Sequence, residues 1–207
     1  LLFYGGNGAV SADMRRAAEF ALDFFPLVIG TLLFASVYAD DFKCRAMQVA
    51  IGAGVSREGI VLAKFGECAL LLLFALPGTR HLFYTDAEAV SVALTVAQVF
   101  LRTLGFMQLA ATLCFLTQNS LQGAIAFALL SSNAMFILIT MTLLTGPLKD
   151  NVGRLRPFLY TALLRSVQSN IQNGKPFAGI FVLAIGMYML LPLILALLGF
   201  RKKELSF

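Results

Sequence analysis

The sequence of 207 residues has no tryptophan, one histidine and three cysteines, and only 13% of its residues are charged. Soluble domains carry about a quarter charged residues, so the composition argues against an ordinary soluble enzyme. The histidine, His81, and the cysteines, Cys44, Cys68 and Cys114, show no familiar metal-ligand spacing and no CxxC pair. The sequence therefore predicts no metal site, and we interpret the cysteines as small, reduced apolar residues.

Motifs for catalysis are also missing from the sequence. There is no phosphate-binding loop of the GxxxxGK[ST] kind and no HExxH metalloprotease motif. An intramembrane serine protease would need a histidine inside an apolar segment, whereas His81 lies between two such segments. We therefore predict that the chain has no catalytic residues and binds no cofactor of its own.

What the sequence has in abundance is long apolar segments, with 59% hydrophobic residues overall. Each is close to the roughly 20 residues that a helix needs to cross a bilayer, and each is too long for a barrel strand. A helix also satisfies its own backbone hydrogen bonds in hydrocarbon. The predicted spans are residues 20–39, 60–76, 90–116, 123–144 and 177–200. The predicted fold is thus an all-α integral membrane protein, with one transmembrane domain over residues 1–207.

The net charge of +5 does not indicate a nucleic-acid-binding protein, because most basic residues lie between the apolar segments, where lipid headgroups would meet them. Five crossings would leave seven Lys or Arg residues on one side and eight on the other. The positive-inside rule therefore does not fix the orientation.

The polar segment between the first two spans has an organisation of its own. A short amphipathic helix is expected over residues 42–51, ended by Gly52 and Gly54, and Ser56 is expected to cap the helix that becomes the second span. Taken alone, this helix has the features of an ordinary surface helix at a membrane interface.

The quartet Gly54-Val55-Ser56-Arg57, with a short basic helix before it and Lys64 after it, resembles the permease subunit of the type-2 ABC transporters, an exporter class. The tail Phe200-Arg201-Lys202-Lys203-Glu204-Leu205 is similar to the basic cluster that ends members of that family. The order and spacing of the spans agree over nearly the whole chain. The family pattern has six spans, so an upstream span is expected to be absent from this sequence.

The resemblance implies a bacterial multi-pass protein of the cytoplasmic membrane, with residues 41–59 and the tail inside and residues 148–175 outside as short helices that dip back into the membrane. It implies two copies of a separate ATPase, which bind ATP and Mg²⁺, and a second permease chain, identical or related. The short helix would be a coupling helix that contacts the ATPase through Phe42, Arg45, Met47 and Gln48. The substrate is left open among peptides, lipids, drugs and ions.

Arg102 is an unusual residue, since it lies near the middle of the third span, where an arginine costs several kcal/mol unless it is paired or hydrated. Thr95 and Gln98 share its helical face. We expect this face to meet protein or water, as part of a substrate path, of a subunit seam, or of a structural pairing that holds the fold.

The alternative function is a secondary transporter driven by an ion gradient, which would need several ionisable groups at mid-membrane and broken helices. Only Arg102 is central, and no predicted span has a clear mid-span Gly/Pro pair, although Pro26 and Pro192 could kink their spans. Glu67, inside the second span, is expected to form a salt bridge with Lys64 rather than a proton relay.

Overall fold

The structure is a computed structural model that describes residues 24–43, 46–75, 89–132 and 156–202. Every regular element in these ranges is a helix, which confirms the all-α prediction. The main helices are α2 (Thr31–Lys43), α3 (Ala46–Gly52), α4 (Arg57–Ala75), α5 (Ala89–Thr117), α6 (Ser120–Ser131), α9 (Tyr160–Gln172), α10 (Ala178–Ile185) and α11 (Leu191–Lys202). Three shorter elements are the π-helices η1 (Pro26–Gly30) and η5 (Gly186–Leu190) and the 3-10 turn η4 (Arg156–Phe158).

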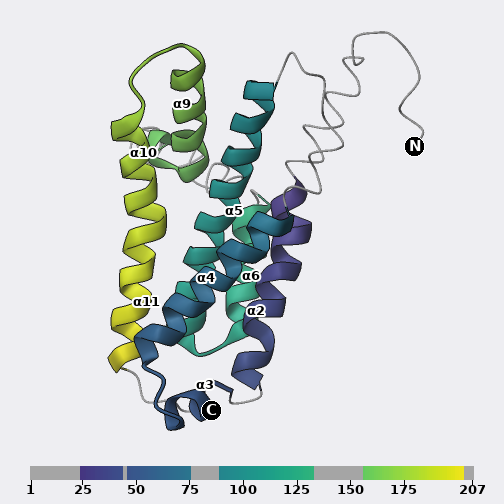
Figure 1. Cartoon of the computed structure of the whole chain (residues 1–207), viewed down its shortest axis with the longest axis vertical. Coiled ribbons are helices and arrows are strands. Elements are labelled where there is room, and N and C mark those ends of the chain that lie inside the picture. Colours follow the sequence, from purple (N-terminus) through teal and green to yellow (C-terminus); the bar gives the residue numbers. More distant parts are fainter. Residues whose placement is uncertain (1–23, 44–45, 76–88, 133–155, 203–207) are drawn as a thin grey trace, which may run out of the picture.

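The helices form an elongated bundle with distinct ends (Figure 1). Helices α2, α5 and α6 and the continuous α10–η5–α11 helix run roughly along the long axis, and α4 crosses them obliquely. The short α3 lies at one end, together with the last residues of α11, and α9 lies at the opposite end beside the start of α10. Helices α3 and α9, from the two segments predicted to lie on opposite sides of the membrane, are thus at opposite ends of the bundle.

Aromatic side chains from four helices fill the core in the half of the bundle nearer α3. Phe34 of α2 stacks on Phe127 of α6 with ring centroids 5.6 Å apart. Phe115 of α5 lies edge-on to Tyr38 at 5.9 Å and contacts Phe200 of α11 at 5.1 Å. All five are buried, so α2, α5, α6 and α11 share one packed interior.

Two helical segments, Ala93–Thr117 and Ala178–Arg201, are long and apolar enough to cross a membrane. Pro26–Tyr38 and Ser120–Ser131 are apolar but shorter. The 19-residue α4 includes four charged residues, at positions 57, 58, 64 and 67, which lower its hydropathy. Of the predicted fourth span, residues 133–144 lie outside the described residues, as do residues 20–23 of the first span and 148–155 of the expected external segment.

Two predicted boundaries near α3 were wrong. The first span was expected to end at Ala39, but α2 continues to Lys43, because two aspartates end an apolar run without ending its backbone hydrogen bonding. The short helix was expected from residue 42 and instead covers Ala46–Gly52. Phe42 therefore belongs to the last turn of α2.

Pro26 and Pro192, the two prolines singled out within the spans, lie next to π-helical turns. Helix η1 begins at Pro26, and η5 ends two residues before Pro192. Proline has no N–H to donate, and a π turn accommodates the missing bond by adding a residue to the turn. The Thr112 hydroxyl, from α5, donates to the Pro192 carbonyl at 2.9 Å. This bond anchors the helix to α5 next to the π turn.

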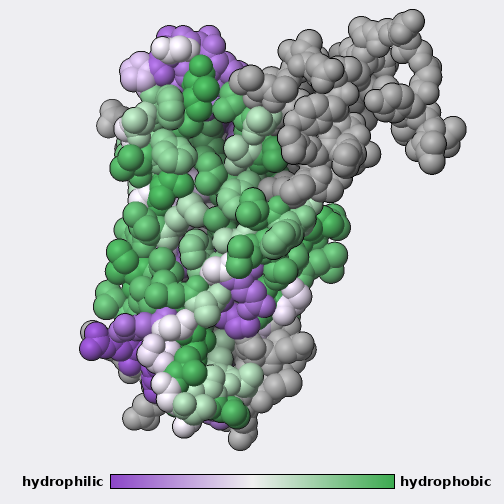
Figure 2. Space-filling view, in the orientation of Figure 1, coloured by the Kyte–Doolittle hydropathy of each residue, from purple (hydrophilic) through white to green (hydrophobic). Residues whose placement is uncertain are grey.

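The face of the bundle seen in Figure 2 is largely apolar, with polar residues gathered mainly toward its two ends. On the α10–η5–α11 helix, Val182, Leu190 and Ile194 are each more than half exposed. Phe74 of α4 is 76% exposed. Contiguous apolar surfaces of this kind mark contacts with lipid or with other proteins.

Candidate functional site

Helix α3 is attached to the end of the bundle by one buried side chain and presents another to the outside. Met47 is 3% exposed and belongs to the main core cluster. Val49 is 71% exposed, and Gln48 is half-buried. A partner that docks on this end of the molecule would therefore meet Val49.

The end of α3 follows the local sequence closely. Gly54 has a φ of +92°, which is accessible to glycine at little cost. Its N–H donates to the Ile51 carbonyl at 3.0 Å, and the Val55 N–H donates to the Ala50 carbonyl at 3.0 Å. These paired bonds form a Schellman motif, so Gly54 ends the helix as predicted, while Gly52 is its last residue.

Ser56 caps α4, as predicted, because its hydroxyl accepts a hydrogen bond from the Gly59 N–H at 3.0 Å. Replacing it with alanine leaves that N–H without its acceptor, so we expect Ser56→Ala to lower the free energy of unfolding by about 1 kcal/mol. Thermal unfolding in detergent measures this. The control is Ser36→Ala, because the exposed Ser36 hydroxyl donates within its own helix to the Leu33 carbonyl. Equal effects in both variants would contradict the capping role.

Arg57 joins the start of α4 to the end of α11. Its Nη1 donates to the Phe200 carbonyl at 3.2 Å, and its guanidinium carbon lies 5.9 Å from the centre of the Phe200 ring. A cation is favoured at the carbonyl end of a helix, where the backbone dipole is negative. The segment that joins α3 to α4 is therefore also linked to α11, through Arg57. Arg201 adds an exposed ion pair with Glu58 at 3.9 Å.

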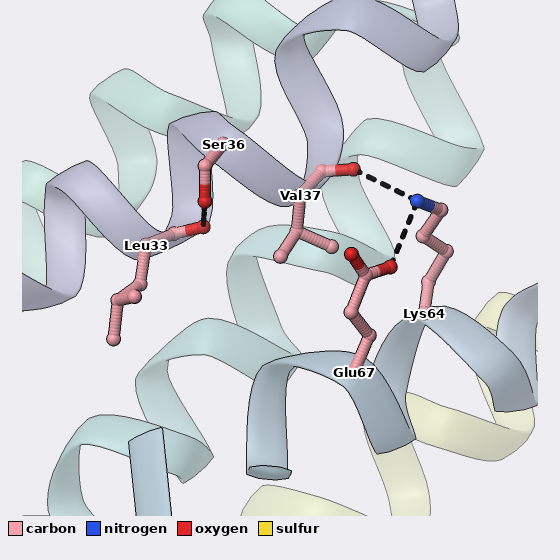
Figure 3. Close-up of polar contacts among 5 residues, drawn as sticks. All are labelled: Leu33, Ser36, Val37, Lys64 and Glu67. Atoms are coloured by element: carbon pink, nitrogen blue, oxygen red, sulfur yellow. Dashed lines mark hydrogen bonds and ion pairs between the residues drawn. The ribbon is translucent and has the colours of Figure 1, made fainter. Parts of the chain in front are cut away.

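A second cross-link joins α4 to α2 (Figure 3). The Lys64 ammonium donates to the Val37 carbonyl at 3.2 Å and to Glu67 at 2.9 Å. The predicted Lys64–Glu67 salt bridge is confirmed. Because Val37 is itself buried, Lys64 holds α4 against the inner face of α2.

Of the four residues predicted to contact an ATPase, the structure places two on α3. Gln48 is accessible, but Met47 points into the core, so the expected direct contact through Met47 does not fit its burial. Met47 was predicted as a contact from its place on the short helix between two spans, which does not show which way its side chain points. Phe42 lies in the last turn of α2, and Arg45 lies outside the described residues.

The polar face of α5 forms the second candidate site. Arg102 is 6% exposed, and Thr95 and Gln98 are half-buried. Helix α9 packs across this side of α5, where Gln168 Nε2 lies 3.5 Å from the Thr95 hydroxyl. The structure therefore buries Arg102 in protein, and its role in a path or seam stays a prediction.

A tyrosine pair that sequence reasoning missed fixes α9 to this face. The Tyr160 hydroxyl donates to the Leu101 carbonyl at 2.6 Å, and its ring stacks on Tyr188 at 4.5 Å. The Tyr188 hydroxyl donates to the Phe158 carbonyl at 2.9 Å. Burial raises the pKa of the Tyr160 phenol, and the neighbouring Tyr188 adds to the rise, so Tyr160 keeps the proton that it donates.

The available sequence signal for this pair was Gly105, an isolated glycine inside a helical segment. A side chain at Gly105 would bring its Cβ to 2.6 Å from the Tyr160 ring carbon Cζ. The glycine thus lets α9 approach α5 closely enough for the Tyr160 hydroxyl to reach a backbone carbonyl of α5.

Within the described ranges, no group of three or more His, Cys, Asp or Glu residues is arranged to hold a metal ion. Comparison of the chain with known protein families, characterised proteins and solved structures finds no match. The features of the chain that bear on function are therefore helix α3, the polar face of α5 and the sequence resemblance.

Proposed function

We propose that this chain is the transmembrane permease subunit of an ATP-driven exporter of the type-2 ABC class, working with a separate ATPase. The observation that carries the proposal is the position of α3. It is a short helix at one end of an apolar bundle, it connects two long helices, and it exposes Val49 while Met47 anchors it in the core. A helix held in this way can be pushed by a partner without detaching from the bundle.

The contacts of α3 suggest how such a movement would spread. Met47 belongs to the core cluster that includes Val37 and Tyr38 of α2. On the other side, the chain passes through Gly54 into α4, and Arg57 links α4 to the Phe200 carbonyl. Displacing α3 would therefore bias α2, α4 and α11 together. Closure of two ATPases around ATP would supply the displacement.

The separation of the polar ends supports a membrane topology in which α3 and the end of α11 face the cytoplasm and α9 faces outside (Figure 1). The multi-pass arrangement in a bacterial cytoplasmic membrane is part of the proposal. Exposed apolar side chains between the two ends would then contact lipid (Figure 2). A second permease chain would complete the path, to which Thr95, Gln98 and Arg102 would contribute.

Single-cysteine labelling tests this topology, on a background without the native cysteines. Ser56 lies at the α3 end and Gln172 at the end of α9, and both are exposed. An impermeant maleimide should label Gln172→Cys in intact cells and should label Ser56→Cys only after the membrane is opened. Equal labelling of both positions in intact cells would contradict the topology.

Co-purification tests the ATPase contact. We expect Val49→Asp to reduce the amount of ATPase retained by the purified permease about tenfold, because a buried, unpaired carboxylate would replace an apolar contact. Gln172→Asp introduces the same side chain at the opposite end and should retain the ATPase. If no ATPase co-purifies with the wild-type chain, the proposal fails. If Val49→Asp retains it fully, α3 is not the contact.

A secondary transporter has one observation in its favour, the π turns near Pro26 and Pro192, which interrupt the regular α-helical hydrogen bonding without breaking the helices. Ion coupling also needs ionisable groups inside the bundle. The carboxylates whose side chains are described, Glu58 and Glu67, are exposed. The buried charged residue among the described positions is Arg102. This pattern favours a transporter that takes its energy from a partner.

A further inference from the structure

At the end of the bundle opposite α3, a cavity of about 310 Å³ opens between α9 and α10. We call it the α9–α10 groove. Phe158, Leu163 and Ser166 line one side, and Gly179, Ile180 and Leu183 line the other. The Ser166 hydroxyl already donates to the Ala162 carbonyl at 2.9 Å, so it needs no acceptor from a molecule bound in the groove. Its volume falls at the lower end of the range for ligand sites, about 300–1,000 Å³.

The walls of the groove are held in place from both sides. Tyr188 fixes η4 to the α10–η5–α11 helix through its bond to the Phe158 carbonyl, and Tyr160 fixes the start of α9 to α5. Gly179 has nothing within 4 Å of the position that a Cβ would occupy, so the missing side chain leaves space open. The groove is therefore a feature of the folded bundle and does not depend on a loop closing over it.

The described segment that forms the groove carries charge of one sign. From Arg156 to Lys202 the sequence contains no aspartate or glutamate. Arg165, next to Ser166 on α9, and Lys175, in the turn between α9 and α10, are both exposed. Figure 2 shows the polar cap at this turn, with apolar surface directly below it along α10. An occupant with an apolar chain and an anionic head would match both features.

We propose that the α9–α10 groove binds one acyl chain of an anionic phospholipid, whose phosphate lies beside Arg165 and Lys175. The inference rests on the membrane placement proposed above, and it needs neither the ATPase nor transport. The groove would hold a lipid of the leaflet that surrounds α9. Cations near a membrane surface attract anionic lipids by about 1 kcal/mol each, so two of them favour such a lipid over a zwitterionic one by about thirtyfold.

Photolabelling tests the site, with the full chain in phosphatidylcholine vesicles that contain a trace of phosphatidylglycerol bearing a diazirine on one acyl chain. Mass spectrometry should find about thirtyfold more label on residues 157–183 than with the matching phosphatidylcholine probe. Labelling of the exposed Phe74 on α4 should be equal for the two probes. Equal labelling by both probes in residues 157–183 would mean ordinary surrounding lipid and would overturn the proposal.

Matched variants test the acyl-chain groove and the headgroup contact separately. Gly179→Leu should fill the groove and remove the excess label, while Gly66→Leu, at a position on α4 that is also open, should leave it unchanged. The double variant Arg165→Gln with Lys175→Gln should lower phosphatidylglycerol labelling to the phosphatidylcholine level. Removing the same charge with Lys202→Gln and Lys203→Gln should not. Excess label that survives Gly179→Leu would overturn the groove assignment.

Flotation of the vesicles distinguishes failure of this inference from failure of the proposed function. A chain that does not float with the vesicles contradicts the membrane placement itself, and with it both proposals. A chain that inserts and shows no selective labelling contradicts the lipid site alone.

Discussion

Gly123→Leu should abolish accumulation of folded protein. Gly123 of α6 faces both α5 and α2, and a Cβ there would collide with the Cys114 sulfur of α5. It would also approach the Ala110 carbonyl to 3.1 Å and the Phe34 ring to 3.2 Å. The carbonyl belongs to the backbone of α5 and cannot rotate away. Overpacking of this kind costs typically 1–3 kcal/mol, and the backbone contact places Gly123→Leu at about 3 kcal/mol or above.

The measurement is the monodisperse fraction in size-exclusion chromatography after extraction in mild detergent, together with the thermal unfolding temperature. Gly66→Leu makes the same substitution where nothing lies within 4 Å, and it should behave like the wild type. A folded Gly123→Leu protein with unchanged thermal stability would show that α2, α5 and α6 do not meet as the structure has them.

Local rules predicted the α3–α4 connection well. Gly54 ends α3 with positive φ, and Ser56 caps α4 with its hydroxyl, both as the sequence indicates. Each is decided by backbone geometry within a few residues, so sequence patterns capture it. The Lys64–Glu67 pair follows in the same way, because residues three apart share one side of a helix.

Contacts between distant segments could not be predicted in this way. The bond from Arg57 to the Phe200 carbonyl spans 143 positions, and the bond from Tyr160 to the Leu101 carbonyl spans 59. Nothing near Arg57 in the sequence indicates which helix end it will meet. The inward direction of Met47 is a similar case, since it depends on how α3 is placed against α2 rather than on the helix itself.

The polar face of α5 could be predicted only in part. Its residues follow helical spacing, so a face with Thr95, Gln98 and Arg102 is readable from the sequence. The element that covers it, α9, belongs to a segment expected to lie outside the main spans. The structure brings α9 onto that face through Gln168 and Tyr160. The sequence therefore indicates that this face meets protein or water. The packing of distant helices determines that α9 is the element that covers it.

Arg102→Leu should lower the free energy of unfolding by about 3–5 kcal/mol if Arg102 has a structural role, because the polar groups around a buried charge stay buried when that charge is removed. Arg102 is 6% exposed on the long α5 helix, so water cannot easily replace the lost interactions. The measurement is thermal unfolding in detergent. Arg165→Leu, which removes an exposed arginine on α9, is the control and should change stability by less than about 0.5 kcal/mol.

The same variant separates the structural role from a role in the substrate path. If Arg102 lines the path, Arg102→Leu should fold with wild-type stability, retain its partner ATPase and lose or alter transport, because a path residue sets substrate affinity while the surrounding packing holds the fold. Arg102→Lys refines the distinction, since it keeps the charge but not the planar, forked donor geometry of the guanidinium. A path that needs only positive charge would tolerate lysine, whereas a structural pairing fitted to guanidinium would not. Unchanged stability, assembly and transport in Arg102→Leu would contradict both roles.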